Sequence, residues 1–290
     1  MSFPQPVALA VAAEAGDFER LRRHRLFGSA DHPSYLRRTE AQLRALRGGG
    51  LAVHLRLLDA VGFEAFCAAR LLSPGDPAAR VAFAADPEYP GDPFVYAGER
   101  LPELLPALVG DHRARLRIAA GCAALLAAVG ECGERAAALL AYAAELYLAL
   151  AAGAGGGRHR LELRADAPAT TPSSAELSAE AELTADGRRR LIVRGRESEA
   201  FCVTLAAVLA GSGPGELLLF SDPLAPLPPL AAAEPGAVEL RGWSVAAGRL
   251  HPLTAFEVQA LCASEEPTGP PPVIARDGFP LPPPPGAEGG

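Results

Sequence analysis

The pattern of apolar and polar positions predicts a mixture of strands and helices. Short apolar runs bounded by turn residues are typical of strands. Such runs occur at residues 52–58, 81–86, 159–165, 175–184, 191–195 and 217–222. Apolar residues spaced by three and four positions are typical of helices. We expect helices on this basis over residues 6–26, 31–47 and 62–72. The expected fold class is therefore α/β or α+β.

One sequence motif occurs twice within this pattern. Glu-Ala-Phe-Cys stands at residues 64–67 and again at 199–202, each time between two predicted strands, the second of which ends in Asp-Pro. A later segment at residues 95–101 is echoed at 245–250. Because Phe and Cys are scarce in this chain, we interpret the pattern as two duplicated strand–helix–strand–strand–helix modules in a pseudo-symmetric arrangement, with N-terminal helices before the first.

A long Ala/Leu-rich segment separates the two modules. Residues 111–152 have a helical pattern that is interrupted near 130–133, which predicts a central helical hairpin. The second arm, residues 136–152, is only 17 residues long and contains Glu145. Because a helix needs about 20 apolar residues to cross a bilayer, burial within the protein is favoured over a membrane span.

Composition also predicts the domain boundaries. The Gly-rich stretch at residues 152–157 is typical of a flexible linker, so we expect domains over residues 1–153 and 154–264. Residues 265–290 are rich in Pro and Gly, and we expect them to form a disordered tail.

The amino-acid composition mainly excludes certain kinds of catalytic and binding site. All 27 basic residues are Arg, and the chain contains neither Lys nor Asn. A Schiff-base Lys, the Lys of a phosphate-binding loop and a Cys-His-Asn triad are therefore excluded. The absence of residues with AT-rich codons indicates a GC-rich genome of actinobacterial type.

Charge argues against one class of partner and leaves another open. The net charge of −7 does not fit a general nucleic-acid binder, which needs a basic face. Residues 17–47 differ from the rest of the chain, because they carry eight Arg against four acidic residues. This segment is either a solvated helix pair whose Arg stems cover apolar surface, or a contact surface for an anionic partner, which could be a nucleic acid, a small phosphorylated metabolite or an acidic protein.

Cysteine and histidine spacing predicts no metal or redox site. The five Cys form no Cys-x-x-Cys pair, and the six His do not have the spacing of zinc-binding motifs. We therefore expect no cofactor. Unpaired cysteines and a poor signal-peptide pattern predict a cytoplasmic protein.

The first module carries one set of candidate catalytic residues. His54 and Arg56 share a face of a predicted strand, and the following helix bears Glu64 and Cys67. In an enzyme, His54 would act as a base, Arg56 would hold an anion and Cys67 would be a nucleophile. The alternatives are an exposed histidine and a small buried cysteine.

The second module carries the remaining candidates. His251 lies where we expect the last helix to begin, and it is a second possible base. Trp243 and Arg241 could hold a planar ligand, although a single Trp is more often a core or interface residue. Glu199, like Glu64 in the first copy of the motif, is a possible ligand contact.

These observations leave three functional classes. The first is a cytoplasmic binding or assembly protein that contacts a protein partner or itself, because the chain has no catalytic signature and has an Arg-rich segment and a Pro-rich tail. The second is a small-molecule enzyme of specialised metabolism with a cleft between the two modules. The third is a membrane-associated protein that uses residues 118–152.

Overall fold

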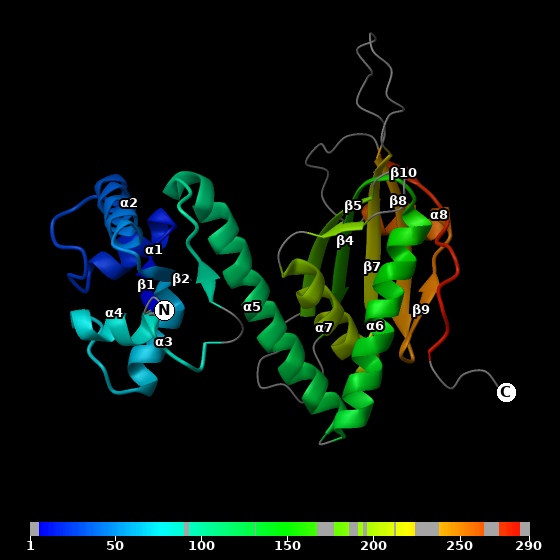
Figure 1. Cartoon of the computed structure of the whole chain (residues 1–290). Coiled ribbons are helices and arrows are strands. Elements are labelled where there is room, and N and C mark those ends of the chain that lie inside the picture. Colours follow the sequence, from blue (N-terminus) through cyan, green and yellow to red (C-terminus); the bar gives the residue numbers. More distant parts are fainter. Residues whose placement is uncertain are drawn as a thin grey trace, which may run out of the picture. The chain divides into compact units, whose positions relative to one another are not determined.

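The computed structural model describes residues 6–89, 93–130, 132–166, 177–185, 191–193, 196–211, 213–223, 238–263 and 273–284. These residues contain eight helices and two β-sheets, which confirms the mixed α/β class (Figure 1). The chain divides into two compact units, Met1–Arg115 and Leu116–Gly290. Helix α5 (Leu101–Val129) contributes residues to both. The sequence analysis had placed its first boundary later, after residue 153.

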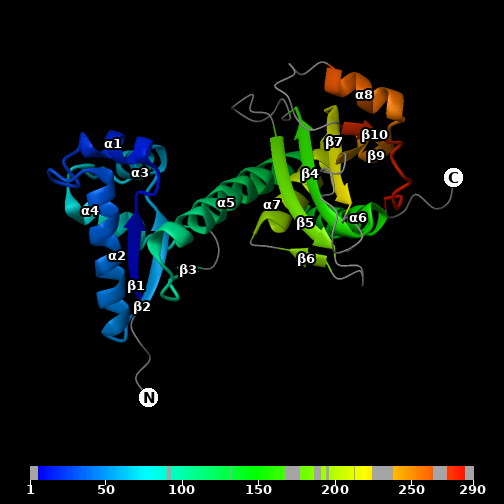
Figure 2. The same cartoon turned by 90° about the horizontal axis from the view of Figure 1, so that it is seen from above.

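Unit 1 is built on a three-stranded sheet with the order β1-β2-β3. Strands β1 (Pro6–Val11) and β2 (Ala52–Leu57) are parallel, and β3 (Phe94–Val95) is antiparallel to β2 (Figure 2). Parallel neighbours need a crossover connection, which helices α1 (Ala15–Arg22) and α2 (His32–Gly48) provide. The central strand, β2, therefore has a neighbour on both edges.

Helices cover both faces of this sheet. One face forms a core with side chains of α2 and of the first half of α5, including Leu43, Leu101 and Leu104. The other face packs with α1, α3 (Ala60–Ala69) and α4 (Pro77–Ala84). The residues of β2 alternate between half-buried and fully buried along the strand. Alternation thus directs one set of β2 side chains toward α4 and the other toward α5.

Aspartate caps fix where three helices of unit 1 begin. Asp31, Asp59 and Asp76 are the N-cap residues of α2, α3 and α4, and each side chain accepts a hydrogen bond from a backbone N–H in the first turn. Such caps satisfy amides that have no partner within the helix.

Two predicted elements of unit 1 are wrong in type. Residues 6–11, expected to be helical, form β1, whose uninterrupted apolar run is typical of a parallel strand covered on both faces. Residues 81–86, expected to be a strand, lie largely in α4. The reason is the helix start at Asp76-Pro77, where Asp76 caps the helix and Pro77 occupies its first turn.

Unit 2 is built on a larger, mostly antiparallel sheet. Its strand order is β10-β8-β7-β4-β5-β6, and β9 also pairs with β8. The strands are β4 (Gly157–Ala165), β5 (Leu177–Ala185), β6 (Leu191–Val193), β7 (Gly215–Pro223), β8 (Val238–Ala246), β9 (Arg249–Pro252) and β10 (Val273–Ala275). β5 and β6 pair antiparallel, and the residues that connect them, 186–190, lie outside the described residues.

Helices α6 (Gly133–Ala154) and α7 (Glu197–Ala210) pack on one face of this sheet to form the core of unit 2. The second half of α5 adds Leu125 and Val129 to the same core. α6 is long and apolar enough to cross a membrane by length and composition. Seven of its side chains are nevertheless buried in unit 2, as in the core helix of a globular domain.

The other face of the sheet carries helix α8 (Ala255–Ala263) over β8 and β10. The edge of β8 is shared by two short strands, because β10 pairs with its first residues and β9 with its last. Proline ends β9 at Pro252, and Pro280 follows β10. Short edge strands flanked by Pro disfavour further strand pairing.

The duplicated, pseudo-symmetric arrangement is not confirmed. The segment between the Glu-Ala-Phe-Cys motif and Asp-Pro is mainly helix α4 in the first half but strand β7 in the second. The strands before the motif also differ, since β2 has a parallel neighbour whereas β6 pairs antiparallel with β5.

Part of the expected disordered tail has a defined structure. Residues 273–284 include β10 and continue as an extended segment on unit 2. The indole N–H of Trp243 donates to the Phe279 carbonyl at 3.0 Å, and the hydroxyl of Tyr142 donates to the Pro282 carbonyl at 2.8 Å. Residues 264–272 and 285–290 lie outside the described residues.

Candidate functional site

The candidate site in unit 1 centres on Arg56, which the sequence analysis identified. Arg56 and His54 are both half-buried on the same face of β2, opposite Ala10 and Ala8 of β1. Strand alternation therefore predicted their common face correctly. The surroundings of Arg56 come from the segment that includes the end of α4 and the loop after it.

The Arg56 guanidinium lies between two aromatic rings. Its central carbon is 3.5 Å from the centre of the Phe83 ring and 3.9 Å from that of Tyr89. The guanidinium donates a hydrogen bond to the Phe83 carbonyl and lies 3.8 Å from the Asp86 carboxylate. Only 11% of the side chain is exposed, and burial lowers the pKa of Arg56. Its Nε is buried, with no hydrogen-bond partner among the described residues.

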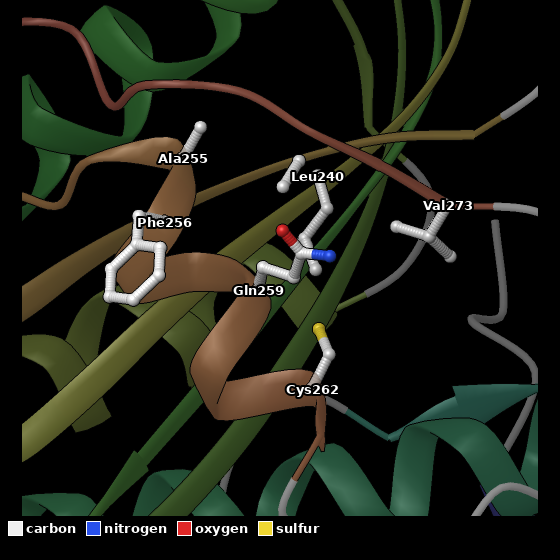
Figure 3. Close-up of a pocket in the computed structure, with 7 residues that line it drawn as sticks. Leu240, Ala255, Phe256, Gln259, Cys262 and Val273 are labelled. Carbon is white, nitrogen blue, oxygen red and sulfur yellow. The ribbon is translucent and has the colours of Figure 1, made fainter.

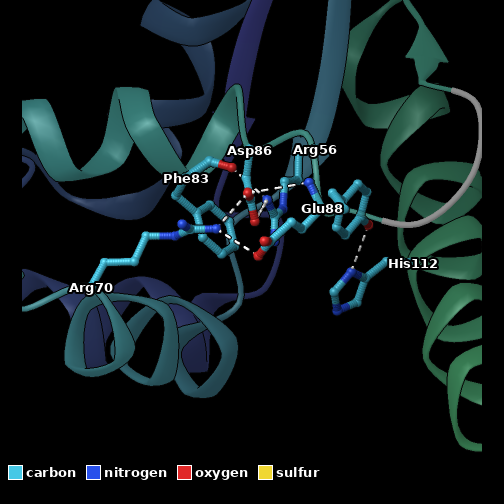
Figure 4. Close-up of polar contacts among 7 residues, drawn as sticks. Arg56, Arg70, Phe83, Asp86, Glu88 and His112 are labelled. Carbon is cyan, nitrogen blue, oxygen red and sulfur yellow. Dashed lines mark hydrogen bonds and ion pairs between the residues drawn. The ribbon is translucent and has the colours of Figure 1, made fainter. Parts of the chain in front are cut away.

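Asp86 links this buried cation to the surface. Its carboxylate accepts a hydrogen bond from Arg70 of the loop after α3 at 2.8 Å, and Arg70 also pairs with Glu88 at 2.8 Å (Figure 4). The Arg70 guanidinium lies over the Phe66 ring. Two guanidinium groups therefore converge on one carboxylate that is almost fully buried.

A second polar chain begins at Tyr89. Its hydroxyl lies 3.1 Å from Nδ1 of His112 on α5, and Nε2 of His112 lies 3.5 Å from a carboxylate oxygen of Asp59, the α3 cap. A proton on Nε2 directed at Asp59 leaves Nδ1 to accept from the Tyr89 hydroxyl. Burial lowers the pKa of His112, partly offset by Asp59, and burial raises the pKa of Tyr89. The histidine is thus neutral and the phenol protonated near neutral pH.

A carboxylate, an imidazole and a hydroxyl that contact one another in this order are the groups needed to transfer a proton. The sequence analysis missed Tyr89, Asp59 and His112 as site residues, because they are far apart along the chain and meet only in the folded structure. One signal was present: Asp111-His112-Arg113 is a charged interruption in an otherwise Ala- and Leu-rich helix.

Cys67 and Glu64 do not join this array through any contact of the described residues. Cys67 is fully buried in the core between α3 and the sheet, and burial raises the pKa of its thiol. Glu64 instead pairs with Arg20 and His24, whose hydrogen bonds lower the pKa of its carboxyl. A buried thiol of this kind is a poor nucleophile.

The candidates in unit 2 contact different partners, although Trp243 and Arg241 both belong to β8. Trp243 is fully buried, and its ring meets Phe279 edge-on at 5.0 Å. Arg241 pairs with Glu239 at 3.0 Å. Glu199 pairs with Arg196 in the first turn of α7.

His251 was expected at the start of a helix, and this is wrong. It is an exposed residue of strand β9, opposite Ser244. The tight turn at Ala247-Gly248, with positive φ at both residues, returns the chain as a hairpin before α8 begins.

Unit 2 contains a different buried polar pair. His159 of β4 and Ser221 of β7 are directly opposite each other, and both are buried. Nε2 of His159 lies 3.1 Å from the Gly155 carbonyl, while its Nδ1 and the Ser221 hydroxyl have no hydrogen-bond partner within the described part of the chain. Burial lowers the pKa of His159.

A groove of about 330 Å³ lies between α8 and the edge of the large sheet. Its lining consists of Leu240, Ala255, Phe256, Gln259, Cys262, Val273 and Ala275. Figure 3 shows Gln259 and Cys262 pointing from α8 toward the space in front of Leu240, with Phe256 and Val273 on opposite sides of Gln259. The Phe256 side chain is 81% exposed. The groove is therefore mainly apolar and has a large aromatic residue at its rim.

Comparison with known protein families gives a match for the first part of the chain only. Residues 2–99 match the model of a domain of unknown function, DUF8829. This match includes Arg56, Asp59 and Tyr89 but ends before His112. No curated protein and no solved structure matches the chain.

Proposed function

We propose that this chain is a cytoplasmic binding or assembly protein that docks another protein chain on the groove between α8 and β10. The observation that carries the proposal is Phe256, which exposes 81% of its surface beside an apolar groove. A single exposed apolar residue needs no explanation, but Val273 of the adjacent strand also lines the groove and is 38% exposed. Contiguous apolar patches of this kind mark protein interaction sites.

The size of the groove supports a protein side chain as its occupant. Small-molecule pockets have volumes of about 300–1,000 Å³ and enclose most of the ligand. This groove is at the lower end of that range and is open along α8. One or two bulky apolar side chains fit such a space, with the Gln259 amide available for a hydrogen bond.

Site-specific photocrosslinking in intact cells tests the proposal. A photoreactive phenylalanine analogue at position 256 should form covalent adducts with a protein. The same analogue at Val61, which is 63% exposed in α3 of unit 1, is the matched control. Equal labelling at the two positions, or none at position 256, would contradict a docking role for the groove.

A second candidate function is a small-molecule enzyme in unit 1. The observation that favours it is that His112 contacts both Asp59 and Tyr89, and that Tyr89 lies against the buried Arg56 cation. Such a site would hold an anionic substrate, with Tyr89 as proton donor. A library of anionic metabolites should then raise the melting temperature of the wild-type protein and leave that of Tyr89→Phe less affected. Identical shifts in both proteins would remove the candidate.

A further inference from the structure

We infer that His112 of α5 is a switch that pairs with Tyr89 when neutral and with Asp59 when protonated, so that acid releases Tyr89 from the Arg56 guanidinium. The inference concerns unit 1 and is independent of the docking function proposed for unit 2. It begins from the position of the imidazole, which lies between a phenol and a carboxylate that come from different elements.

In the neutral state His112 holds Tyr89 in place. Its Nδ1 lies 3.1 Å from the Tyr89 hydroxyl (Figure 4), whereas its Nε2 lies 3.5 Å from the Asp59 carboxylate. The first distance is that of an ordinary hydrogen bond, and the second is longer than one. With the single ring proton assigned to the nitrogen that faces the carboxylate, Nδ1 accepts from the phenol. The neutral ring therefore binds Tyr89 more closely than Asp59.

Protonation reverses this preference. Both nitrogens of a charged imidazole are donors, so Nδ1 no longer accepts from Tyr89. The guanidinium carbons of Arg56 and Arg115 lie 3.9 Å and 5.2 Å from the centre of the Tyr89 ring, and a guanidinium contains no acceptor. The phenol hydrogen must then turn toward water. The contact of Nε2 with the Asp59 carboxylate, in contrast, becomes a pair of opposite charges and strengthens.

The groups around His112 determine which form the closed arrangement favours. Burial of the ring is the largest influence and lowers the pKa of His112. Arg56 on β2 acts in the same direction. Three carboxylates partly offset both, namely Asp59 at the α3 cap, Asp111 on α5 and Asp17 on α1. A group with a lowered pKa takes up a proton more readily once its site has opened, so the closed arrangement is favoured above about pH 6.5 and becomes less favoured as the pH falls below it.

The release of Tyr89 uncovers one face of a buried cation. Arg56 lies between the rings of Phe83 and Tyr89, and 11% of its side chain is exposed. Phe83 is fixed in the core of unit 1, because it is buried and meets the Phe63 ring edge-on at 5.4 Å. The side of Arg56 that faces Tyr89 is therefore the one that opens, and water or a small anion reaches the guanidinium from this side.

NMR titration of the His112 imidazole in the full chain tests the two contacts separately. Tyr89→Phe removes the hydroxyl that binds the neutral ring, so it should raise the pH of the titration midpoint. Asp59→Asn removes the charge that binds the protonated ring but retains a capping residue for α3, so it should lower the midpoint. His54→Gln, at a position of β2 opposite Val95, should leave the midpoint of His112 unchanged.

Hydrogen exchange tests the release itself. The Tyr89 amide donates to the Asp86 carbonyl at 3.2 Å, and the Glu88 amide donates to the Asp86 side chain at 3.3 Å. Between about pH 7 and pH 5, the exchange rate of these amides, corrected for its intrinsic pH dependence, should rise at least about threefold in the wild type and stay constant in His112→Gln. The α5 amides next to His112 should keep their corrected rates, because Asp59 still holds the ring.

Each result has a definite meaning. Midpoints that shift in the same direction in Tyr89→Phe and Asp59→Asn overturn the inference. Loop exchange that does not depend on pH also overturns it, and so does faster exchange of α5 together with the loop, because His112 would then have lost both partners. If circular dichroism shows that either midpoint variant is unfolded, the comparison of the wild type with His112→Gln remains decisive.

Discussion

At Arg56, stacking on two rings and a hydrogen bond to a carbonyl are closer contacts than the ion pair with Asp86. The planar guanidinium suits this position, since a Lys ammonium neither stacks in the same way nor offers a fork of donors. Buried cations are costly unless such contacts compensate for the lost water. Arg56 therefore holds together strand β2, the end of α4 and the following loop.

Replacing Arg56 by Lys tests this role. We expect Arg56→Lys to lower the free energy of unfolding of unit 1 by about 1–3 kcal/mol, because the stacking and the bond to the Phe83 carbonyl are lost. Arg38→Lys, on the exposed side of α2, should change it by less than about 0.5 kcal/mol. Urea unfolding of both variants provides the measurement. Equal effects would mean that charge alone is required at position 56.

His159 gives a pH dependence whose direction follows from its burial. Its pKa is lowered in the folded protein, so the unfolded chain takes up the proton more readily. Its contribution to stability is present above about pH 6.5 and is lost as the pH falls through that value toward the folded pKa. The groups that face it are the Gly155 carbonyl, Ser221, Arg241 and Asp222.

The comparison with a variant isolates this titration from those of the carboxylates. His159→Gln should show a smaller loss of unfolding free energy between about pH 7 and pH 5 than the wild type, because Gln does not titrate. Parallel pH profiles for the two proteins would show that His159 is protonated to the same extent in both states.

Alternation along β2 was sufficient to place His54 and Arg56 on one face. It could not predict the partners of Arg56, since Phe83 and Tyr89 lie about 30 residues later and are positioned by a helix that the sequence analysis took for a strand. His112 comes from α5, further still along the chain. Site residues assembled from separate elements are determined by packing, which periodicity alone does not contain.

At the scale of elements, the interface between α5 and α7 depends on the absence of a side chain. A Cβ at Gly121 of α5 would lie 2.9 Å from a methyl of Val203 and 3.2 Å from the Thr204 amide nitrogen, both on α7. The backbone of α7 cannot retreat without disturbing the core of unit 2. Gly121 therefore allows the two helices to pack closely, despite the low helix propensity of glycine.

A second glycine of the same helix provides the control. A Cβ at Gly110 would meet no heavy atom within 4 Å beyond its chain neighbours and the nearby backbone of its own helix, so Gly110→Ala should stabilise the protein by about 0.5–1 kcal/mol through helix propensity. Gly121→Ala should destabilise it by about 1–3 kcal/mol, because overpacking exceeds that gain. Thermal unfolding of both variants distinguishes the effects, and stabilisation by Gly121→Ala would contradict close packing.

Asp59 joins two elements, because it caps α3 and faces His112 of α5. In a double-mutant cycle, Asp59→Ala and His112→Gln should couple by about 0.5–3 kcal/mol. Asp76 caps α4 without touching His112, so Asp76→Ala and His112→Gln should be additive within about 0.5 kcal/mol. Additivity in the first pair would show that the approach of Asp59 to His112 contributes nothing to stability.

The sequence contains recognisable signals for helix starts, but the signal before α4 was overlooked. Asp31 followed by Pro33 marks the start of α2, and the same signal at Asp76-Pro77 marks α4, whose apolar run resembled a strand. Residues 6–11 show the opposite problem, since a strand covered on both faces has no alternation by which to recognise it.

For the whole molecule, each unit has its own core, which predicts more than one unfolding transition. Trp243 is the only Trp of the chain and lies in unit 2, so its fluorescence should follow one transition while circular dichroism follows both. Gly121→Ala should shift the fluorescence transition, and Arg56→Lys should not. Coincident transitions by both probes would show that the two units unfold together.

The segment over residues 279–282 also affects the order in which the two units can complete their folding. Unit 1 contains every strand it needs once residue 115 has been synthesised, and N-terminal units generally fold first during translation. The pocket around Trp243, in contrast, is closed only when Phe279 and Pro282 have emerged. A chain that ends after residue 263 would therefore contain a complete first unit and a second unit whose tryptophan is accessible to water.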